Sequence, residues 1–233
     1  QSDDNEANVP AMRLILEGGG TRAAYSAGVV HALSRAHVRF DAVVGSSSGS
    51  MNAAFFATCP TDTLCHLWSH VVPNEGFISY WRLFTPWGPP GLDVDRMVDD
   101  VVNGQGALDI PRAVAGNPAL YVVATTLPDG KAHIVKPNAG NLCDWIRASH
   151  AIPIGYNRIV RVEGRDYVDG GVAAPVPFDL PIDEPSSGPT VVILTRPMST
   201  KKPAPNWWQQ AFLRTAVPKQ GAGLTLRQHE LHD

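Results

Sequence analysis

The pentapeptide Gly45-Ser46-Ser47-Ser48-Gly49 has the residue types and the spacing of a serine nucleophile. The run 41–44 precedes it and the mostly apolar segment 50–57 follows it, so the sequence predicts a strand, a sharp turn and a helix. Flanking glycines let the central serine take a strained conformation and let the helix pack closely behind it. Gly-x-Ser-x-Gly in this setting is typical of the nucleophile elbow of serine acyl hydrolases, although serine and glycine clusters are also ordinary loop material. Ser47 is therefore the candidate nucleophile.

A glycine-rich loop, Gly18-Gly19-Gly20-Thr21-Arg22, follows a predicted buried strand and precedes a helical pattern with one apolar face. Three glycines allow backbone N–H groups to turn inward, and the dipole of the following helix adds positive potential, so the loop is suited to an anion. The loop lacks the Gly-Lys-Ser/Thr of a phosphate-binding loop, and a dinucleotide-binding Gly-x-Gly-x-x-Gly pattern is broken at Ala23. A tight turn without a ligand is the alternative interpretation.

The third candidate is Asp169, which stands at the end of a short predicted strand, after the hairpin-like segment 157–166 and before Gly170 and Gly171. Asp-Gly-Gly by itself is mostly a turn signal. Ester hydrolysis, however, needs a nucleophile, a proton acceptor within hydrogen-bond reach, and donors aimed at the developing oxyanion. A solvated carboxylate is a poor base for an alcohol, so we expect Asp169 in a partly desolvated pocket.

In this order, the three motifs resemble those of the patatin-like phospholipase family. The glycine-rich loop matches the family's oxyanion loop, the pentapeptide its nucleophile elbow, and Asp169-Gly170-Gly171 its base motif. The segment 146–153 resembles the Ala-Ser-x-Ala-x-Pro stretch that precedes the aspartate in the family, and the segment 173–177 resembles the stretch after it. The resemblance covers residues 12–196, most of the chain.

The resemblance implies a Ser47–Asp169 dyad without histidine, which acts on lipid or other carboxylic esters through an acyl-enzyme. Because an oxyanion loop of amides needs no metal to polarise the carbonyl, we expect no cofactor and no metal. The residues implied to form the oxyanion hole are Gly18, Gly19, Gly20, Thr21 and Ser48. The residues implied to support the site are Arg22, Gly45, Gly49, Gly170 and Gly171.

One residue departs from the family pattern. The family usually has glycine where this chain has Ala23. If the backbone there has a negative φ at the start of a helix, alanine is harmless and is the better helix former. If the site needs a positive φ, the oxyanion loop is distorted. We expect the first case, because Ala23 and Ala24 open a regular helical pattern.

Two other functions stay open at this stage. An α/β-hydrolase triad needs a histidine after the aspartate, and His229 and His232 in the polar C-terminal tail are the two that qualify. The second alternative is a catalytically weak, lipid-binding relative, which Ala23 keeps open and the intact serine–aspartate pair argues against.

An aromatic segment, 76–92, lacks clean periodicity and has two interpretations. It forms an acyl-chain pocket, a lid or an element that enters a membrane interface, or it is a loop folded over the core. His150 lines the cleft, where the family often has a small residue, or is a satisfied histidine at a helix end. The candidate substrate-pocket residues are Phe77, Tyr80, Trp81, Phe84, Trp87 and His150.

Hydrophobic periodicity predicts an α/β fold, with a mostly parallel sheet sandwiched by helices in the patatin-like three-layer arrangement. The expected strands are 12–16, 41–44, 119–126, 158–162 and 190–195, and the expected helices are 23–36, 48–58, 61–70, 94–102 and 141–149. Both glycine-containing motifs then lie at strand C-terminal ends, where open α/β sheets bind ligands. We expect a flexible segment at 1–10, the hydrolase domain at 11–197, and a tail at 198–233 that is the start of further helices.

Composition limits the partners. The chain has 233 residues, 44% of them hydrophobic, which is enough for one core. Its net charge of −3 argues against nucleic acid, and three scattered cysteines argue against a disulfide framework or a zinc site. The sequence has no apolar run of the length of a transmembrane helix and no signal-peptide pattern. We expect a soluble, cytoplasmic or peripherally membrane-associated protein that binds a lipid or ester substrate; the oligomeric state is not predicted.

Overall fold

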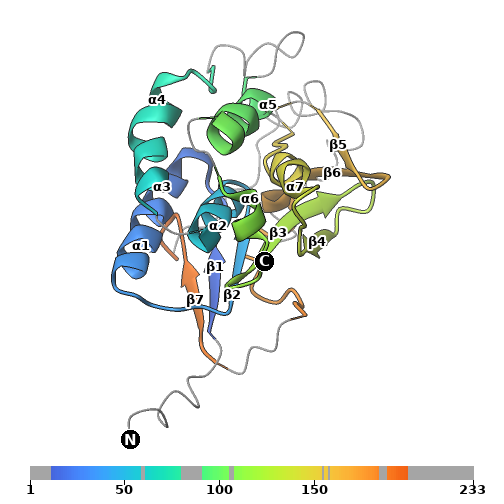
Figure 1. The fold of residues 1–233 in the computed structure, drawn as a ribbon. Helices are drawn as coiled ribbons and strands as arrows, with labels where there is room; N and C mark the ends of the chain where they lie inside the picture. Colours follow the sequence, from blue (N-terminus) through green and yellow to red (C-terminus); the bar gives the residue numbers. More distant parts are fainter. Residues whose placement is uncertain are drawn as a thin grey trace, which may run out of the picture.

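A computed structural model describes residues 12–58, 61–79, 91–104, 108–153, 155–156, 158–183 and 188–198. Its centre is a seven-stranded sheet in which six strands follow the order β5-β6-β3-β2-β1-β7, and β4 pairs with β3 (Figure 1). Strands β7, β1, β2 and β3 are parallel neighbours, whereas β4, β5 and β6 pair antiparallel. The strands are β1 (Arg13–Leu16), β2 (Ala42–Ser46), β3 (Ala119–Thr126), β4 (Ala132–Val135), β5 (Val160–Val162), β6 (Arg165–Asp169) and β7 (Thr190–Ile193).

Helices connect these strands along the chain. They are α1 (Ala23–Arg35), α2 (Ser48–Thr58), α3 (Asp62–His66), α4 (Val72–Asn74), α5 (Val94–Met97), α6 (Ile110–Ala113) and α7 (Leu142–Ser149). Two π-helical segments, η2 (Leu67–Val71) and η4 (Val98–Gly104), and two 3₁₀ turns, η1 (Gly20–Arg22) and η5 (Gly170–Val172), complete the described elements. The predicted α/β fold, with mostly parallel strands and flanking helices, is confirmed.

The side chains of the central strands alternate between two apolar cores. Leu14, Leu16 and Val43 point into the main core, which the helices fill, and α2 is buried along its whole length there. Ile15 and Val44 point to the opposite face, where apolar side chains of the segment 174–182 cover them. Strands buried on both faces explain why the sequence shows short continuous apolar runs instead of alternation.

Strand β3 pairs with both β2, which leads into the pentapeptide, and β6, which ends at Asp169. Val123 pairs with Ser46, the last residue of β2. The next residue, Ala124, pairs with Asp169, the last residue of β6. Both of these β3 residues also pair with β4, so β4 occupies one edge of β3, and β2 and β6 share the other. Because β2 is parallel to β3 and β6 is antiparallel, the C-terminal ends of β2 and β6 meet head to head.

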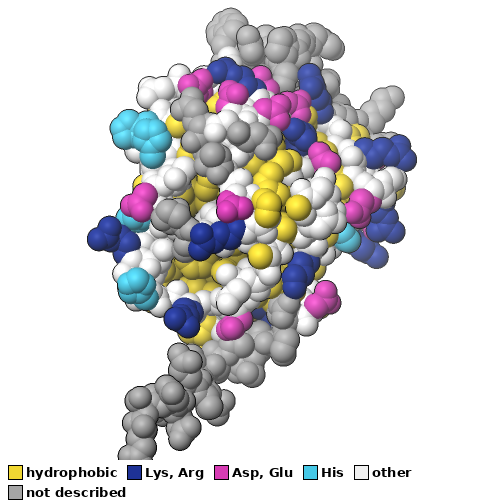
Figure 2. Space-filling view, viewed as in Figure 1, with side chains coloured by type: hydrophobic (Ala, Val, Ile, Leu, Met, Phe, Trp, Pro, Cys, Tyr) yellow, Lys and Arg dark blue, Asp and Glu magenta, His cyan; other side chains and the backbone are white. Residues whose placement is uncertain are grey.

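An ion-pair cluster holds α5 and η4 against α7. Arg147 of α7 contacts Asp95 at 2.9 Å, Asp144 at 3.0 Å and Asp99 at 3.3 Å, and Arg158 contacts Asp95 at 2.9 Å. Acidic and basic side chains mix around α5 at the top of Figure 2. Since exposed ion pairs are individually weak, the cluster acts mainly by fixing the orientation of these helices.

We predict that Gly170→Ala destabilises the fold strongly. A Cβ at position 170 would meet the carbonyl group of Val123, with the oxygen in direct overlap, and would lie 2.9 Å from the Ser46 hydroxyl oxygen. The junction of β2 and β6 would have to open, at a cost of about 2–4 kcal/mol in the free energy of unfolding. Urea denaturation measures the loss.

The matched control is Gly28→Ala in α1, where an added Cβ meets no atom within 4 Å. This substitution is expected to stabilise the protein by up to about 1 kcal/mol, because alanine is the better helix former. Equal stability of Gly170→Ala and the parent would contradict the tight junction.

Candidate active site

Ser47 lies in the sharp turn between β2 and α2, and its backbone has the strained geometry that the pentapeptide predicts. Its φ is +52°, in the left-handed region that non-glycine residues rarely adopt. The flanking glycines allow close packing, since a Cβ on Gly45 would overlap Gly49, and one on Gly49 would overlap the carbonyl oxygen of Leu16. The turn therefore holds the Ser47 side chain clear of both elements.

The hydroxyl of Ser47 donates a hydrogen bond directly to the carboxylate of Asp169, with 2.6 Å between Oγ and Oδ2. Both residues are only 5% exposed. A short bond between a hydroxyl and a carboxylate is of the strong, charge-assisted kind. The sequence predicted these two residues as partners, and the head-to-head meeting of β2 and β6 brings them into contact.

Main-chain groups and one threonine fix the position of Asp169. Its backbone N–H donates to the carbonyl of Ala151 at 3.0 Å, and its carbonyl accepts from the Thr125 hydroxyl at 2.7 Å. The second carboxylate oxygen, Oδ1, accepts from the N–H of Gly171 at 2.7 Å, which caps η5. With Oδ1 held in this way, Oδ2 faces Ser47.

Ser149 is a supporting residue that the sequence analysis did not single out. Its hydroxyl accepts from the Ser47 N–H at 2.9 Å and donates to the carbonyl of Val123 at 2.6 Å. It therefore joins the strained turn to β3. The segment 146–153, which resembles a family stretch, was the signal that could have identified it.

The glycine-rich loop lies over the turn that bears Ser47. The Gly19 N–H donates to the Ser48 hydroxyl at 3.2 Å, and Gly20 has φ +57°, which favours glycine. Gly18 differs from the expectation, because its N–H donates to the carbonyl of Pro175 at 3.1 Å and so points into the fold. Arg22 is exposed at the surface.

The departure at Ala23 causes no backbone strain. Ala23 is fully buried and has φ −65° and ψ −9°, in the right-handed helical region. Its carbonyl accepts a hydrogen bond of 2.9 Å from Asn52 of α2, which ties the start of α1 to α2. Alanine fits this position, as the sequence analysis expected.

A buried carboxylate anchors the loop from behind. Glu17, immediately before the three glycines, is 1% exposed and contacts Arg196 at 2.9 Å. It also accepts from the N–H and, at 3.0 Å, from the hydroxyl of Thr195. The Thr195 side chain fills the space beside Gly19, so β1 and the end of β7 fix the loop together.

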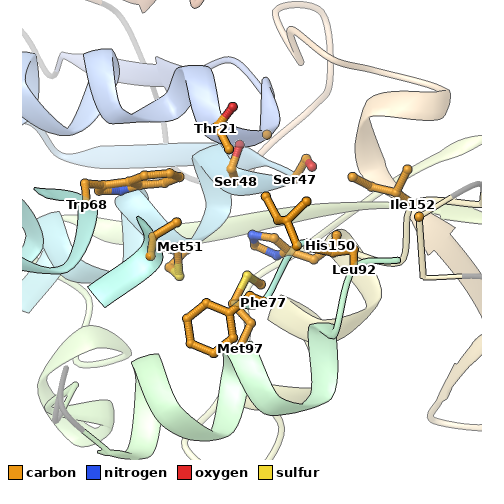
Figure 3. A pocket seen from close by; sticks show the side chains of 14 residues that line it. Thr21, Ser47, Ser48, Met51, Trp68, Phe77, Leu92, Met97, His150 and Ile152 are labelled. Carbon is orange, nitrogen blue, oxygen red and sulfur yellow. The ribbon is translucent and has the colours of Figure 1, made fainter. Parts of the chain in front are cut away.

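A cavity of about 310 Å³ opens beside Ser47 (Figure 3). Thr21 and Ser48 contribute polar groups, and the rest of the wall is predominantly apolar. The apolar lining side chains are Met51, Trp68, Val72, Phe77, Ile78, Leu92, Met97 and Ile152. Of the predicted pocket residues, Phe77 and His150 line this cavity, whereas Tyr80, Trp81, Phe84 and Trp87 lie outside the described residues.

Among the described residues that line this cavity, His150 is the one with an ionisable side chain, and it is 3% exposed. Its Nδ1 lies 2.8 Å from the carbonyl oxygen of Ile146. Burial lowers the pKa of His150 to about 4, against a smaller opposing effect of that hydrogen bond. The ring is therefore neutral near pH 7.

Residues 14–182 match the family model described as patatin-like phospholipase. The chain belongs to the patatin-like phospholipase family. This family consists of lipid acyl hydrolases, which act on lipid esters, and the predicted family is confirmed.

The chain is 28% identical over 204 residues to the uncharacterized protein YjjU of Escherichia coli (strain K12), a match that covers 84% of this chain and 55% of that protein. The crystal structure of VipD from Legionella pneumophila is similar with a TM-score of 0.47 and 14% identity, over 80% of this chain and 50% of that one. The chain spans about half the length of both proteins.

Within the described ranges, no three or more histidine, cysteine, aspartate and glutamate side chains group in a way that could hold a metal ion. None of the described helices combines the length and the apolar character that crossing a bilayer requires. His229 and His232, the candidates for a triad, lie outside the described residues.

Acidification is expected to destabilise the fold through His150. The histidine stays neutral in the folded protein down to a pKa of about 4, whereas in the unfolded chain it binds a proton near its ordinary pKa of about 6.5. The free energy of unfolding should fall by about 2 kcal/mol between pH 7 and pH 5 from this group alone.

Urea denaturation at several pH values tests this in the parent and in His150→Phe, which should lack that part of the pH dependence. His66→Gln removes an exposed histidine and should keep the parental slope. Identical slopes in the parent and His150→Phe would contradict the buried neutral histidine.

Ser149→Ala is expected to lower the free energy of unfolding by about 1–3 kcal/mol, because the buried N–H of Ser47 loses its acceptor. Urea denaturation measures the change. Ser69→Ala removes an exposed hydroxyl and should stay within about 0.5 kcal/mol of the parent. A stability of Ser149→Ala equal to that of Ser69→Ala would show that the bond to Ser47 contributes nothing.

Proposed function

We propose that this chain is a serine acyl hydrolase that cleaves carboxylic esters of lipids through a dyad of Ser47 and Asp169. The observation that carries the proposal is the hydrogen bond of 2.6 Å between Ser47 Oγ and Asp169 Oδ2, at the wall of a predominantly apolar cavity. A nucleophile in direct contact with its base, beside a cavity that fits an acyl chain, is the arrangement that ester hydrolysis requires.

In the first step, the Ser47 oxygen attacks the ester carbonyl while Asp169 takes the hydroxyl proton. Collapse of the tetrahedral intermediate breaks the bond to the leaving alcohol, which receives that proton, and leaves the acyl group on Ser47. In the second step, Asp169 takes a proton from water, the resulting hydroxide attacks the acyl-enzyme, and the proton returns to Ser47. The overall products are a carboxylic acid and an alcohol.

Main-chain amides near Ser47 are the proposed oxyanion donors. Gly20, Thr21 and Ser48 line the cavity, and Gly19 lies against the Ser48 hydroxyl. The Ser48 amide belongs to the first turn of α2, whose dipole favours negative charge. Each such donor contributes about 3–4 kcal/mol to transition-state stabilisation in related chemistry. Gly18 is left out of the proposed set, because its N–H is bonded to the carbonyl of Pro175 inside the fold. The Gly19 N–H is bonded to the Ser48 hydroxyl and would have to exchange that bond for one to the oxyanion.

A histidine-containing triad is the weaker candidate mechanism. In a triad the imidazole stands between the serine and the carboxylate. Here the two side chains are in direct contact, which leaves no space between them for a ring. The neighbouring histidine of the cavity, His150, has its Nδ1 bonded to the carbonyl of Ile146 and not to a carboxylate.

The prediction that tests the dyad uses p-nitrophenyl esters with acyl chains of four to sixteen carbons. Ser47→Ala and Asp169→Asn should each lower kcat/KM by about 10³-fold or more, because each removes one member of a unit that works together. In the parent, kcat/KM should rise up to about fourfold per methylene until the cavity is filled, since burying one methylene is worth about 0.8 kcal/mol.

Matched controls separate chemistry from folding. Asp183→Asn and Ser69→Ala make the same chemical changes at exposed positions and should keep parental turnover. Circular dichroism of Ser47→Ala and Asp169→Asn checks that the fold is retained. Turnover that survives Ser47→Ala would rule out the mechanism, and its absence in the parent would favour a lipid-binding relative.

A further inference from the structure

His150 is a polar group in a part of the cavity that is otherwise apolar. Figure 3 shows its ring among Met51, Phe77 and Leu92, and all four residues line the same cavity as Ser47. The residue is only 3% exposed, and its Nε2 atom is buried. A polar atom that is buried without a hydrogen-bond partner lowers the stability of the fold, so buried polar side chains usually have one.

The hydrogen bond that His150 makes fixes its tautomer. The carbonyl oxygen of Ile146 can only accept, so Nδ1, 2.8 Å away, carries the proton and donates it. Because the ring is neutral, Nε2 then has a lone pair and no hydrogen. The imidazole therefore presents an acceptor and no second donor.

The Nε2 acceptor has no partner. It is buried, and none of the described residues makes a hydrogen bond to it. The side chains around it in the cavity, Met51, Phe77 and Leu92, have no hydrogen-bond donor. Since the described residues supply no donor, a ligand that brings one into the cavity would satisfy Nε2.

We propose that Nε2 of His150 accepts a hydrogen bond from a hydroxyl on the acyl chain, so that the enzyme prefers hydroxylated acyl groups. This inference rests on the proposed function and names the substrate class of the same site. A neutral hydroxyl suits the cavity better than a charged ammonium, because burying an unpaired charge among apolar side chains is far more costly. Sites that hydrogen-bond a substrate hydroxyl discriminate against the analogue that lacks it, since the buried group is then left unpaired.

The test compares p-nitrophenyl decanoate with p-nitrophenyl hydroxydecanoates that carry the hydroxyl near, midway along or at the end of the chain. At least one hydroxylated ester should be cleaved with a kcat/KM about tenfold higher in the parent, the effect of one neutral hydrogen bond. His150→Phe keeps the ring shape but removes the acceptor, and should abolish the preference.

Two further variants make the comparison specific. His150→Gln carries a side-chain carbonyl and should retain part of the hydroxyl preference. Met97→Leu changes the cavity wall without changing an acceptor and should keep the parental ratio of the two substrates, whatever its absolute rate. Equal cleavage of all esters by the parent, or a preference that survives His150→Phe, would overturn the inference and leave the proposed function intact.

A glycerol hydroxyl on the leaving alcohol offers the same donor, so a second arm compares monodecanoylglycerol with ethyl decanoate. A His150-dependent preference seen here and not with the hydroxydecanoates would overturn the assignment to the acyl chain. Calorimetric binding of decanoate and hydroxydecanoates to Ser47→Ala separates the two proposals. Tighter binding of a hydroxydecanoate, lost in the Ser47→Ala/His150→Phe double variant, supports the inference even without turnover, and equal binding overturns it.

Discussion

The head-to-head meeting of β2 and β6 on one edge of β3 is the constraint on which the site depends. Ser46, the last residue of β2, and Asp169, the last residue of β6, lie opposite consecutive residues of β3. Ser47, which follows Ser46, is therefore placed beside the carboxylate of Asp169. A sheet fixes such positions through backbone hydrogen bonds, which are far stiffer than side-chain torsions. The arrangement explains how a serine and an aspartate that lie 122 positions apart can be in direct contact without an intervening histidine.

Much of the fold could be predicted, because it depends on local signals. The strands around 13–16, 42–46 and 119–126 are apolar runs next to glycine-rich turns, and α1, α2 and α7 follow helical patterns close to their predicted limits. The two glycine-containing motifs could be placed together from the rule that ligands bind at strand C-terminal ends. Pairing Ser47 with Asp169 needed the family resemblance, since a lone Asp-Gly-Gly indicates only a turn.

Other features depend on contacts that the sequence does not reveal. β4 and α6 are four residues long each and have weak patterns, and they exist because β3 and α2 offer them a surface. The roles of Ser149, Thr125 and Glu17 arise from hydrogen bonds to distant backbone groups, which no spacing rule gives. The inward orientation of the Gly18 amide likewise depends on Pro175, which follows much later in the chain.

The two parts of the site come from different parts of the chain. Ser47, Asp169 and the glycine-rich loop lie at the ends of β2, β6 and β1, whereas most of the apolar wall comes from the connection between α2 and β3, through Trp68, Phe77 and Met97. That connection forms none of the described sheet. It packs into the main core and is joined to α7 by the ion-pair cluster, so substitutions of single wall residues would reshape the cavity while the sheet keeps Ser47 and Asp169 in register.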